Sequence, residues 1–226
     1  MCFVGRQREL QQITNALKDG HNVIIRGHYG IGKTSLVDRI AAENSLHWHF
    51  AFVDFSQTAG KMAKALMSQY SSRHRNKSVK NLRYKARRYI LSQAAPKNNV
   101  KQVIVLDNIV KITSHRLAFL RELLLENNYF FIAIVEAFLP EQSLFDLRAQ
   151  LYPATMIELL HLPKNNVCAY FEHAALKHNL PWTKKQIAAL AEISRGYPLN
   201  MRETVKRHRQ IQSVKKQPLA GGACGN

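Results

Sequence analysis

Short apolar runs alternate with amphipathic stretches over the first 162 residues of the chain. The apolar runs are rich in Val, Ile and Phe, which is typical of buried strands. They predict strands at residues 23–27, 49–55, 103–107, 129–138 and 155–162. Apolar residues three or four apart predict helices at residues 33–42, 59–70, 83–93 and 115–126. Apolar strands separated by helices indicate an α/β fold in three layers, a parallel sheet covered by helices on both faces.

The pattern changes after Pro163, where helical stretches follow one another without a strand. The expected helices cover residues 166–178, 183–194 and 198–211. Thr183 suits an N-cap, with Gln186 three residues on, and Pro198 suits the first turn of the last helix. The pattern therefore predicts a core at residues 1–162, a small helical unit at 163–212 and a disordered tail at 213–226.

One loop, between the first strand and the helix that follows, carries a motif with known chemistry. Gly27-His28-Tyr29-Gly30-Ile31-Gly32-Lys33-Thr34 fits G-x-x-x-x-G-K-S/T in the strand, loop and helix context that this motif requires. The backbone N–H groups of such a loop surround phosphate oxygens, Lys33 binds the β- and γ-phosphates, and the Thr34 hydroxyl binds Mg²⁺. The motif predicts ATP and Mg²⁺ as cofactors, held by the loop and by Ser35 directly after it.

The second half of such a site is an acidic residue at the end of a neighbouring buried strand. Asp107 ends the run at 103–107 and is the candidate that holds the water shell of Mg²⁺. Asn108 follows it, where many hydrolysing enzymes with this motif have a Glu that activates water. Because an amide cannot accept that proton, hydrolysis is expected to be slow, absent or served by another carboxylate.

Glu136 is a candidate for that other carboxylate, since it lies near the end of the next strand. A carboxylate close to the γ-phosphate would repel it unless Mg²⁺ or an arginine intervened. The alternative is a strand-end Glu that points to solvent. Both interpretations stay open from the sequence.

The high positive charge of the chain indicates a polyanionic binding partner. The 226 residues hold 33 Lys and Arg against 15 Asp and Glu, a net charge of +18, which is typical of proteins that bind nucleic acid. Residues 55–106 contain no acidic residue, and their cations repel one another unless an anion neutralises them. The helix expected at 83–93 would turn its cations outward with Tyr84 close by, which suits phosphate contacts and stacking. The candidate nucleic-acid contacts are Arg73, Arg75, Lys77, Lys80, Arg83, Lys85, Arg87 and Arg88.

Other classes of protein fit the composition poorly. A mean hydropathy of −0.26 and the interruption of the longest apolar stretch by Glu136 argue against a membrane protein. The cysteines, Cys2, Cys168 and Cys224, are far apart, so neither a disulfide framework nor a zinc site is expected. A cytoplasmic protein that acts on DNA, with no metal other than Mg²⁺, is the expectation.

The N-terminal residues resemble a known family. Phe3-Val4-Gly5-Arg6-Gln7-Arg8-Glu9-Leu10 resembles the F-x-G-R-x-x-E-L box of initiator-type AAA+ ATPases, a branch that includes origin-recognition and transposon target-selection ATPases. Leu160-His161-Leu162-Pro163 resembles the start of that family's helical lid, and Gly196-Tyr197-Pro198 its sensor-2 element. The resemblance spans residues 3–209 and implies an AAA+ core with a C-terminal lid. It makes Val4 and Gly5 candidate contacts of the adenine base.

Two arginines of the family match imperfectly. The sensor-2 Arg commonly follows a Gly-x-Pro, where this chain has Leu199, so Arg202 on roughly the same helix face is the substitute. The family's trans-acting arginine finger lies between the fourth strand and the lid, where this chain offers Arg148. The resemblance thus implies catalytic roles for Arg148 and Arg202, which join Lys33, Asp107 and Glu136 in the expected catalytic set.

The resemblance also implies a function. We expect an ATPase that forms a homo-oligomeric ring or filament on DNA, duplex DNA being favoured, and that recruits a partner such as a transposase during transposition target selection. Binding should be largely independent of DNA sequence and sensitive to salt. The alternatives are a replication initiator or helicase loader, and a nucleotide switch without hydrolysis in signalling or defence.

Overall fold

The computed structural model describes residues 3–70, 101–125 and 129–215 of the chain. It divides into two compact units. The sheet unit comprises Gln7–Tyr29 and Lys33–Leu159, and the helical unit comprises Met1–Arg6, Gly30–Gly32 and Leu160–Asn226. The helix predicted at 83–93 and all eight candidate nucleic-acid contacts lie outside the described residues. The boundary at residue 162 stays a prediction.

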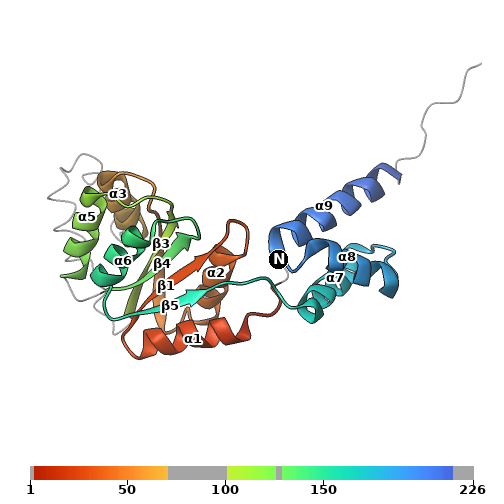
Figure 1. The fold of residues 1–226 in the computed structure, drawn as a ribbon, viewed down its shortest axis with the longest axis horizontal. Helices are drawn as coiled ribbons and strands as arrows, with labels where there is room; N and C mark the ends of the chain where they lie inside the picture. Colours follow the sequence, from red (N-terminus) through yellow and green to blue (C-terminus); the bar gives the residue numbers. More distant parts are fainter. Residues whose placement is uncertain (1–2, 71–100, 126–128, 216–226) are drawn as a thin grey trace, which may run out of the picture. The chain divides into compact units, whose positions relative to one another are not determined.

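The sheet unit is built on five parallel strands in the order β2-β3-β4-β1-β5 (Figure 1). The strands are β1 Asn22–Gly27, β2 Trp48–Asp54, β3 Lys101–Ile109, β4 Tyr129–Glu136 and β5 Ala154–Glu158. Strand β1 is buried almost without interruption, as a strand covered on both faces must be. The parallel α/β fold predicted from the sequence is confirmed.

Helices cover both faces of this sheet. Helices α1 Gln7–Lys18 and α2 Lys33–Glu43 lie on one face, and α3 Ala59–Tyr70, α5 Ser114–Leu124 and α6 Glu141–Gln150 lie on the other (Figure 1). Helix α3 turns Met62 and Leu66 into the core that it shares with β2, β3 and β4. Its lysines, Lys61 and Lys64, are exposed. This amphipathic division explains why the periodicity of residues 59–70 predicted the helix.

Two helices were not predicted, and one strand ends earlier than the sequence predicts. Helices α1 and α6 were not predicted, although Leu10, Ile13 and Leu17 have helical spacing and are buried along α1. Strand β5 ends at Glu158 rather than at residue 162. The N–H of Leu159 still donates to the carbonyl oxygen of Arg26 in β1 at 2.8 Å, whereas the N–H of Leu162 donates to the carbonyl oxygen of Gly196 at 2.8 Å.

The helical unit packs α7 Lys164–His178, α8 Lys184–Ser194 and α9 Pro198–Lys215 around a small apolar core. The predicted N-cap of α8 is confirmed, since the Thr183 side chain accepts from the Gln186 N–H in a capping box. Helix α9 continues to Lys215, beyond the expected end at residue 211, so residues 213–215 are helical and not part of a disordered tail. Gln212 anchors the extra turn by donating to the carbonyl oxygen of Asn179 at 2.8 Å.

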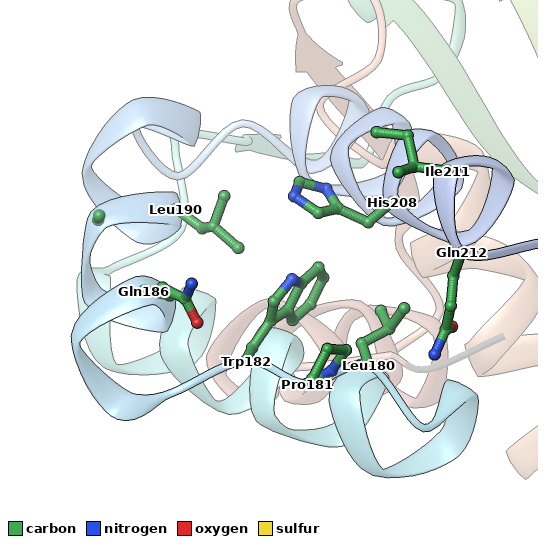
Figure 2. Close-up of a pocket in the computed structure, with 9 residues that line it drawn as sticks. Leu180, Pro181, Trp182, Gln186, Leu190, His208, Ile211 and Gln212 are labelled. Atoms are coloured by element: carbon green, nitrogen blue, oxygen red, sulfur yellow. The ribbon is translucent and has the colours of Figure 1, made fainter. Parts of the chain in front are cut away.

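Trp182 lies in the middle of this helical unit. Its ring makes edge-on contacts with Phe171 and His208, with ring centroids 5.7 Å and 5.1 Å away. A cavity of about 350 Å³ opens beside it, and Leu190 of α8 and Ile211 of α9 stand on its walls (Figure 2). Trp182 thus joins α7 and α9 and packs against the apolar core of the helical unit.

Candidate nucleotide site

The carboxyl ends of three strands bring acidic residues to one edge of the sheet. Asp54 of β2 pairs in register with Asp107 of β3, and Glu136 of β4 pairs in register with Gly27 of β1. Strand β1 leads into the glycine loop, and Lys33 begins helix α2 directly after it. Ligands of open parallel sheets bind at this carboxyl edge.

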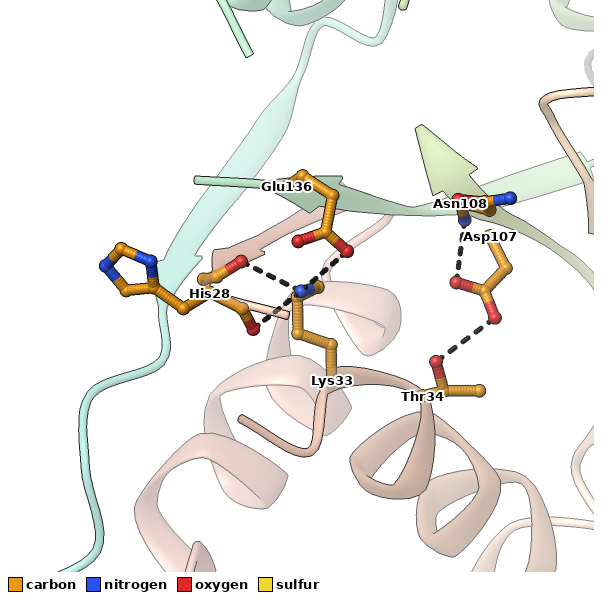
Figure 3. A network of polar contacts seen from close by, with 7 residues as sticks. His28, Lys33, Thr34, Asp107, Asn108 and Glu136 are labelled. Carbon is orange, nitrogen blue, oxygen red and sulfur yellow. Dashed lines mark hydrogen bonds and ion pairs between the residues drawn. The ribbon is translucent and has the colours of Figure 1, made fainter. Parts of the chain in front are cut away.

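Lys33 is buried at this edge, with 5% of its surface exposed. Its Nζ donates to the carbonyl oxygens of Gly27 at 2.8 Å and His28 at 3.0 Å, and it forms an ion pair with Oε1 of Glu136 at 3.0 Å (Figure 3). Glu136 is itself only 8% exposed. The interpretation of Glu136 as a solvent-facing side chain is therefore wrong, because the carboxylate turns inward to neutralise a buried ammonium.

Thr34 and Asp107 form the second contact of the site. The Thr34 hydroxyl donates to Oδ2 of Asp107 at 3.1 Å, and the N–H of Asn108 donates to the other carboxylate oxygen at 2.7 Å (Figure 3). The strand register shifts between Leu106 and Ile109, and Asn108 has a positive φ of 62°. The Asp107 carboxylate, next to this irregularity, contacts Thr34 of α2. A hydroxyl beside a carboxylate is a hard oxygen donor set, which fits Mg²⁺.

Asp54 belongs to the same edge and was missed in the sequence. Asn108 Nδ2 donates to Oδ1 of Asp54 at 3.4 Å, the Ser56 N–H donates at 2.9 Å and Gln57 donates at 3.0 Å. Hydrogen bonding from Ser56, with smaller contributions from Gln57 and Asn108, holds the pKa of the Asp54 carboxyl below its ordinary value. The signal that could have found it is the one that found Asp107, an acidic residue at the end of an apolar run.

Asp38 adds negative charge near Asp107. It lies one turn after Thr34 on α2. Partial burial, and then the charge of Asp107, raise the pKa of the Asp38 carboxyl. Carboxylates that disfavour one another's charge in this way are stabilised by a divalent cation, which agrees with the oxygen donors of Thr34 and Asp107.

The glycine loop has the backbone that the motif requires. Gly30 and Gly32 have φ values of 79° and 97°, which residues with a side chain rarely adopt. Ile31 between them is buried, with 1% of its surface exposed, whereas His28 and Tyr29 are exposed. Of the side chains in this loop, Ile31 is thus buried and those of His28 and Tyr29 face solvent, which leaves the backbone N–H groups as the part of the loop suited to a phosphate.

The residues carried over from the AAA+ resemblance lie in both units. Val4 packs against the apolar core of the helical unit, and a Cβ on Gly5 would lie 2.3 Å from Nδ2 of Asn166. Arg202 is exposed on α9. Arg148 is exposed on α6, and in the described ranges no hydrogen bond or ion pair joins it to the Lys33 and Asp107 contacts. The roles of these four residues stay predictions.

The family follows from a comparison with family models. The model of the AAA ATPase domain matches residues 2–132, more than half of the chain. The chain belongs to this family. The match includes the glycine loop and the contact between Thr34 and Asp107, and it ends four residues before Glu136. Among curated proteins, none matches the chain.

Solved structures place the AAA ATPase domain in a wider group of similar folds. RuvB of Thermotoga maritima, a Holliday junction branch migration motor, is 18% identical with a TM-score of 0.62, over 95% of this chain and 65% of that one. The Orc1 protein of Aeropyrum pernix in complex with DNA is 14% identical with a TM-score of 0.55, over 96% and 70%. Hsp104 of S. cerevisiae in complex with casein is 12% identical with a TM-score of 0.67, over 95% and 38%.

At these identities the likeness shows the fold alone. The chain spans just under two thirds of the length of the RuvB structure, at 65%. In the part of the AAA ATPase domain that the structure describes, every helix is too short or too polar to cross a bilayer.

Proposed function

We propose that this chain is an ATPase that binds ATP with Mg²⁺, assembles on duplex DNA and there recruits or positions a protein partner. The observation that carries the proposal is the hydrogen bond from Thr34 to Asp107 at 3.1 Å beside the buried ammonium of Lys33. This pair would place an Mg²⁺ ion next to the lysine of the phosphate loop, as nucleotide hydrolysis requires.

Each residue of the site has a proposed task. The loop N–H groups with Lys33 and Ser35 orient the phosphates, and Thr34 and Asp107 hold Mg²⁺. When bound, Mg²⁺ supplies a positive charge that neutralises the phosphate oxygens. Val4 and Gly5 contact the base, whereas Glu136, Arg148 and Arg202 complete the catalytic set. Arg148 acts on the nucleotide of a neighbouring copy, which makes assembly a condition of fast hydrolysis.

The DNA part of the proposal rests on charge. The net charge is +18, and 12 Lys and Arg occur in residues 55–106 without any acidic residue. In the described residues, α3 exposes Lys61 and Lys64, and α9 exposes Arg202, Lys206, Arg207 and Arg209. Two similar structures are named for DNA, the RuvB motor and the Orc1 complex, but Hsp104 is bound to casein. The fold alone therefore favours neither partner, and the charge favours DNA.

The process that we propose is transposition target selection, with a transposase as the recruited partner. It is supported by the long basic segment and by the resemblance of residues 3–10 to the box of initiator-type AAA+ ATPases, a branch that includes transposon target-selection ATPases. An assembly with such a segment would follow the DNA backbone without reading bases, as a protein that selects many targets must. We expect it to act in the cytoplasm, on DNA.

Electron microscopy tests the assembly directly. The purified protein is imaged with duplex DNA, with and without the non-hydrolysable analogue AMP-PNP. Rings or filaments on DNA that need the analogue, and that Lys33→Ala does not form, are the expected result. Monomers that ignore DNA under both conditions would contradict the proposal.

A variant of the basic segment separates DNA binding from nucleotide binding. Replacing Arg83, Arg87 and Arg88 together by Glu should cost DNA affinity far more than ATP affinity, because these side chains are proposed to contact phosphates of the DNA. Equal losses of both affinities would indicate a misfolded protein instead.

A second candidate function is a nucleotide switch without hydrolysis, and Asn108 favours it. Its side-chain amide donates to Asp54 at 3.4 Å, in the place where a Glu would activate water. ATP turnover measured with saturating DNA separates the two functions. Turnover stimulated by DNA supports the ATPase, and nucleotide-dependent assembly without turnover supports the switch.

A further inference from the structure

The protein itself engages all the hydrogen-bond donors of Lys33. A lysine ammonium has three N–H donors and no acceptor. Nζ of Lys33 lies 2.8 Å from the Gly27 oxygen, 3.0 Å from the His28 oxygen and 3.0 Å from Oε1 of Glu136 (Figure 3). A nucleotide phosphate that binds Lys33 must therefore displace one of these three acceptors.

Glu136 is the acceptor that can leave. The Gly27 oxygen is held in place because the Ala137 N–H also donates to it at 3.1 Å, and the His28 oxygen belongs to the backbone of the loop. The Glu136 carboxylate stands on a side chain with rotatable bonds, so it can turn away without a backbone change. Phosphate binding at Lys33 thus breaks the ion pair first.

A displaced Glu136 carboxylate would lie in unfavourable surroundings. Its side chain is 11% exposed, and among the described residues Oε2 is buried with no hydrogen-bond partner even before displacement. Loss of Lys33 would leave Oε1 unpaired as well, beside an anionic phosphate. A buried carboxylate without a cation, next to a like charge, is costly.

We infer that Glu136 competes with the nucleotide phosphates for Lys33, and that it weakens binding of a nucleoside triphosphate more than of a diphosphate. The inference rests on the proposed nucleotide site. The lysine of this motif reaches both the β- and the γ-phosphate, so the triphosphate brings more negative charge to the same ammonium and to the Glu136 carboxylate.

This role differs from the one expected for Glu136 from the sequence. The carboxylate is directed at Lys33, whereas Thr34 and Asp107 form a separate contact on the other side of the site (Figure 3). Glu136 thus has a second task beside the catalytic one proposed above, because its charge on Lys33 affects which nucleotide the site prefers.

Calorimetry of nucleotide binding tests the inference with Glu136→Gln. Gln keeps the size of the side chain and an oxygen acceptor for Lys33, and it removes the charge. With Mg²⁺ present, we expect AMP-PNP to bind about tenfold more tightly than to the wild type, and ADP at most about threefold more tightly. The matched control is Glu141→Gln, whose carboxylate pairs with Arg26 at 2.8 Å but is 75% exposed, and it should bind both nucleotides as the wild type does.

Three results would overturn the inference or its basis. If Glu136→Gln binds AMP-PNP no more tightly than the wild type does, Glu136 does not compete with the phosphates for Lys33. If the variant gains equal affinity for ADP and AMP-PNP, Glu136 does not affect the preference between diphosphate and triphosphate. Lys33→Ala that binds AMP-PNP as the wild type does overturns the proposed nucleotide site instead. Circular dichroism checks the fold of each variant.

A second variant covers the case in which Glu136→Gln does not fold. Glu136→Asp keeps the charge but shortens the side chain by one methylene, so the contact with Lys33 lengthens. It should bind AMP-PNP more tightly than the wild type, and binding that is equal or weaker overturns the inference.

Discussion

The ammonium nitrogen of Lys33 and the carboxylate of Glu136 lie 3.0 Å apart, and both side chains are almost fully shielded from solvent. Lys33 begins the helix after the glycine loop, and Glu136 ends strand β4. Each charge offsets the cost of burying the other. The lysine that is proposed to bind phosphate is thus held in place before any nucleotide arrives.

The first prediction concerns the stability that this pair provides. Lys33→Ala should lower the free energy of unfolding by about 3 kcal/mol, because it leaves the Glu136 carboxylate buried without its cation. The double variant Lys33→Ala/Glu136→Gln should recover at least half of that loss. Urea unfolding at pH 7 measures both. The single variant Glu136→Gln is measured as well. If the changes in unfolding free energy of the two single variants add up to that of the double variant, the two side chains are not coupled.

The second prediction concerns the magnesium ligands. Thr34→Ala removes the hydroxyl that contacts Asp107, so Mg²⁺ should strengthen ATP binding of this variant far less than that of the wild type. ATP is titrated into each protein in the presence of Mg²⁺ and again in the presence of EDTA, and the two affinities are compared. Thr34→Ser keeps the hydroxyl and serves as the control. If Mg²⁺ strengthened ATP binding of Thr34→Ala as much as that of the wild type, Thr34 would not be a magnesium ligand.

The third prediction concerns the missing carboxylate. Asn108→Glu should raise ATP turnover at least about tenfold, because a positioned general base accelerates proton transfer strongly. Asn108 has a φ of 62°, so a Glu there adds about 1 kcal/mol of backbone strain. Asn108→Gln carries similar strain without the charge and is the control. Unchanged turnover in Asn108→Glu would mean that another carboxylate already acts as the base.

The fourth prediction compares two glycines with similar backbone conformations. Gly196 and Gly20 have φ values of 72° and 80°, but a Cβ on Gly196 would lie 2.2 Å from the Leu162 oxygen, whereas a Cβ on Gly20 would meet nothing within 4 Å. Gly20→Ala should cost about 1 kcal/mol of stability from backbone strain alone. Gly196→Ala should cost more than about 3 kcal/mol, because the backbone of Leu162 must also move. Thermal unfolding of both variants measures the two losses of stability. Equal losses would show that the close approach of a Cβ on residue 196 to the Leu162 oxygen costs no stability.

The fifth prediction concerns DNA binding by α3. Each phosphate contact contributes about 0.9 to the slope of log K against log salt for duplex DNA. Replacing Lys61 and Lys64 by Ala should therefore reduce that slope by up to about 1.8. Fluorescence anisotropy over a range of salt concentrations measures it. Lys18→Ala, on α1 at the opposite face of the sheet, should leave the slope unchanged, and an equal reduction there would indicate a general effect of charge.

Features that depend on neighbouring residues could be predicted from the sequence alone. The alternation of apolar runs and helical periodicity determined the parallel α/β fold, and the motif at residues 27–34 determined where the loop turns into a helix. The capping box of Thr183 and Gln186 was equally predictable, since both partners lie within one turn. Such signals are local, because backbone preference and capping act over a few residues.

Features that join distant residues were decided only by the tertiary structure. Nothing local in the sequence shows that β4 lies between β3 and β1, and this order brings Glu136 to the register position of Gly27 and so to Lys33. The pairing of β2 with β3 likewise sets Asp54 beside Asp107 and Asn108. The physical reason is that a carboxylate at a strand end has the same local pattern whether it meets solvent, a metal or an ammonium. Which of these it meets depends on which strands become neighbours and in what register.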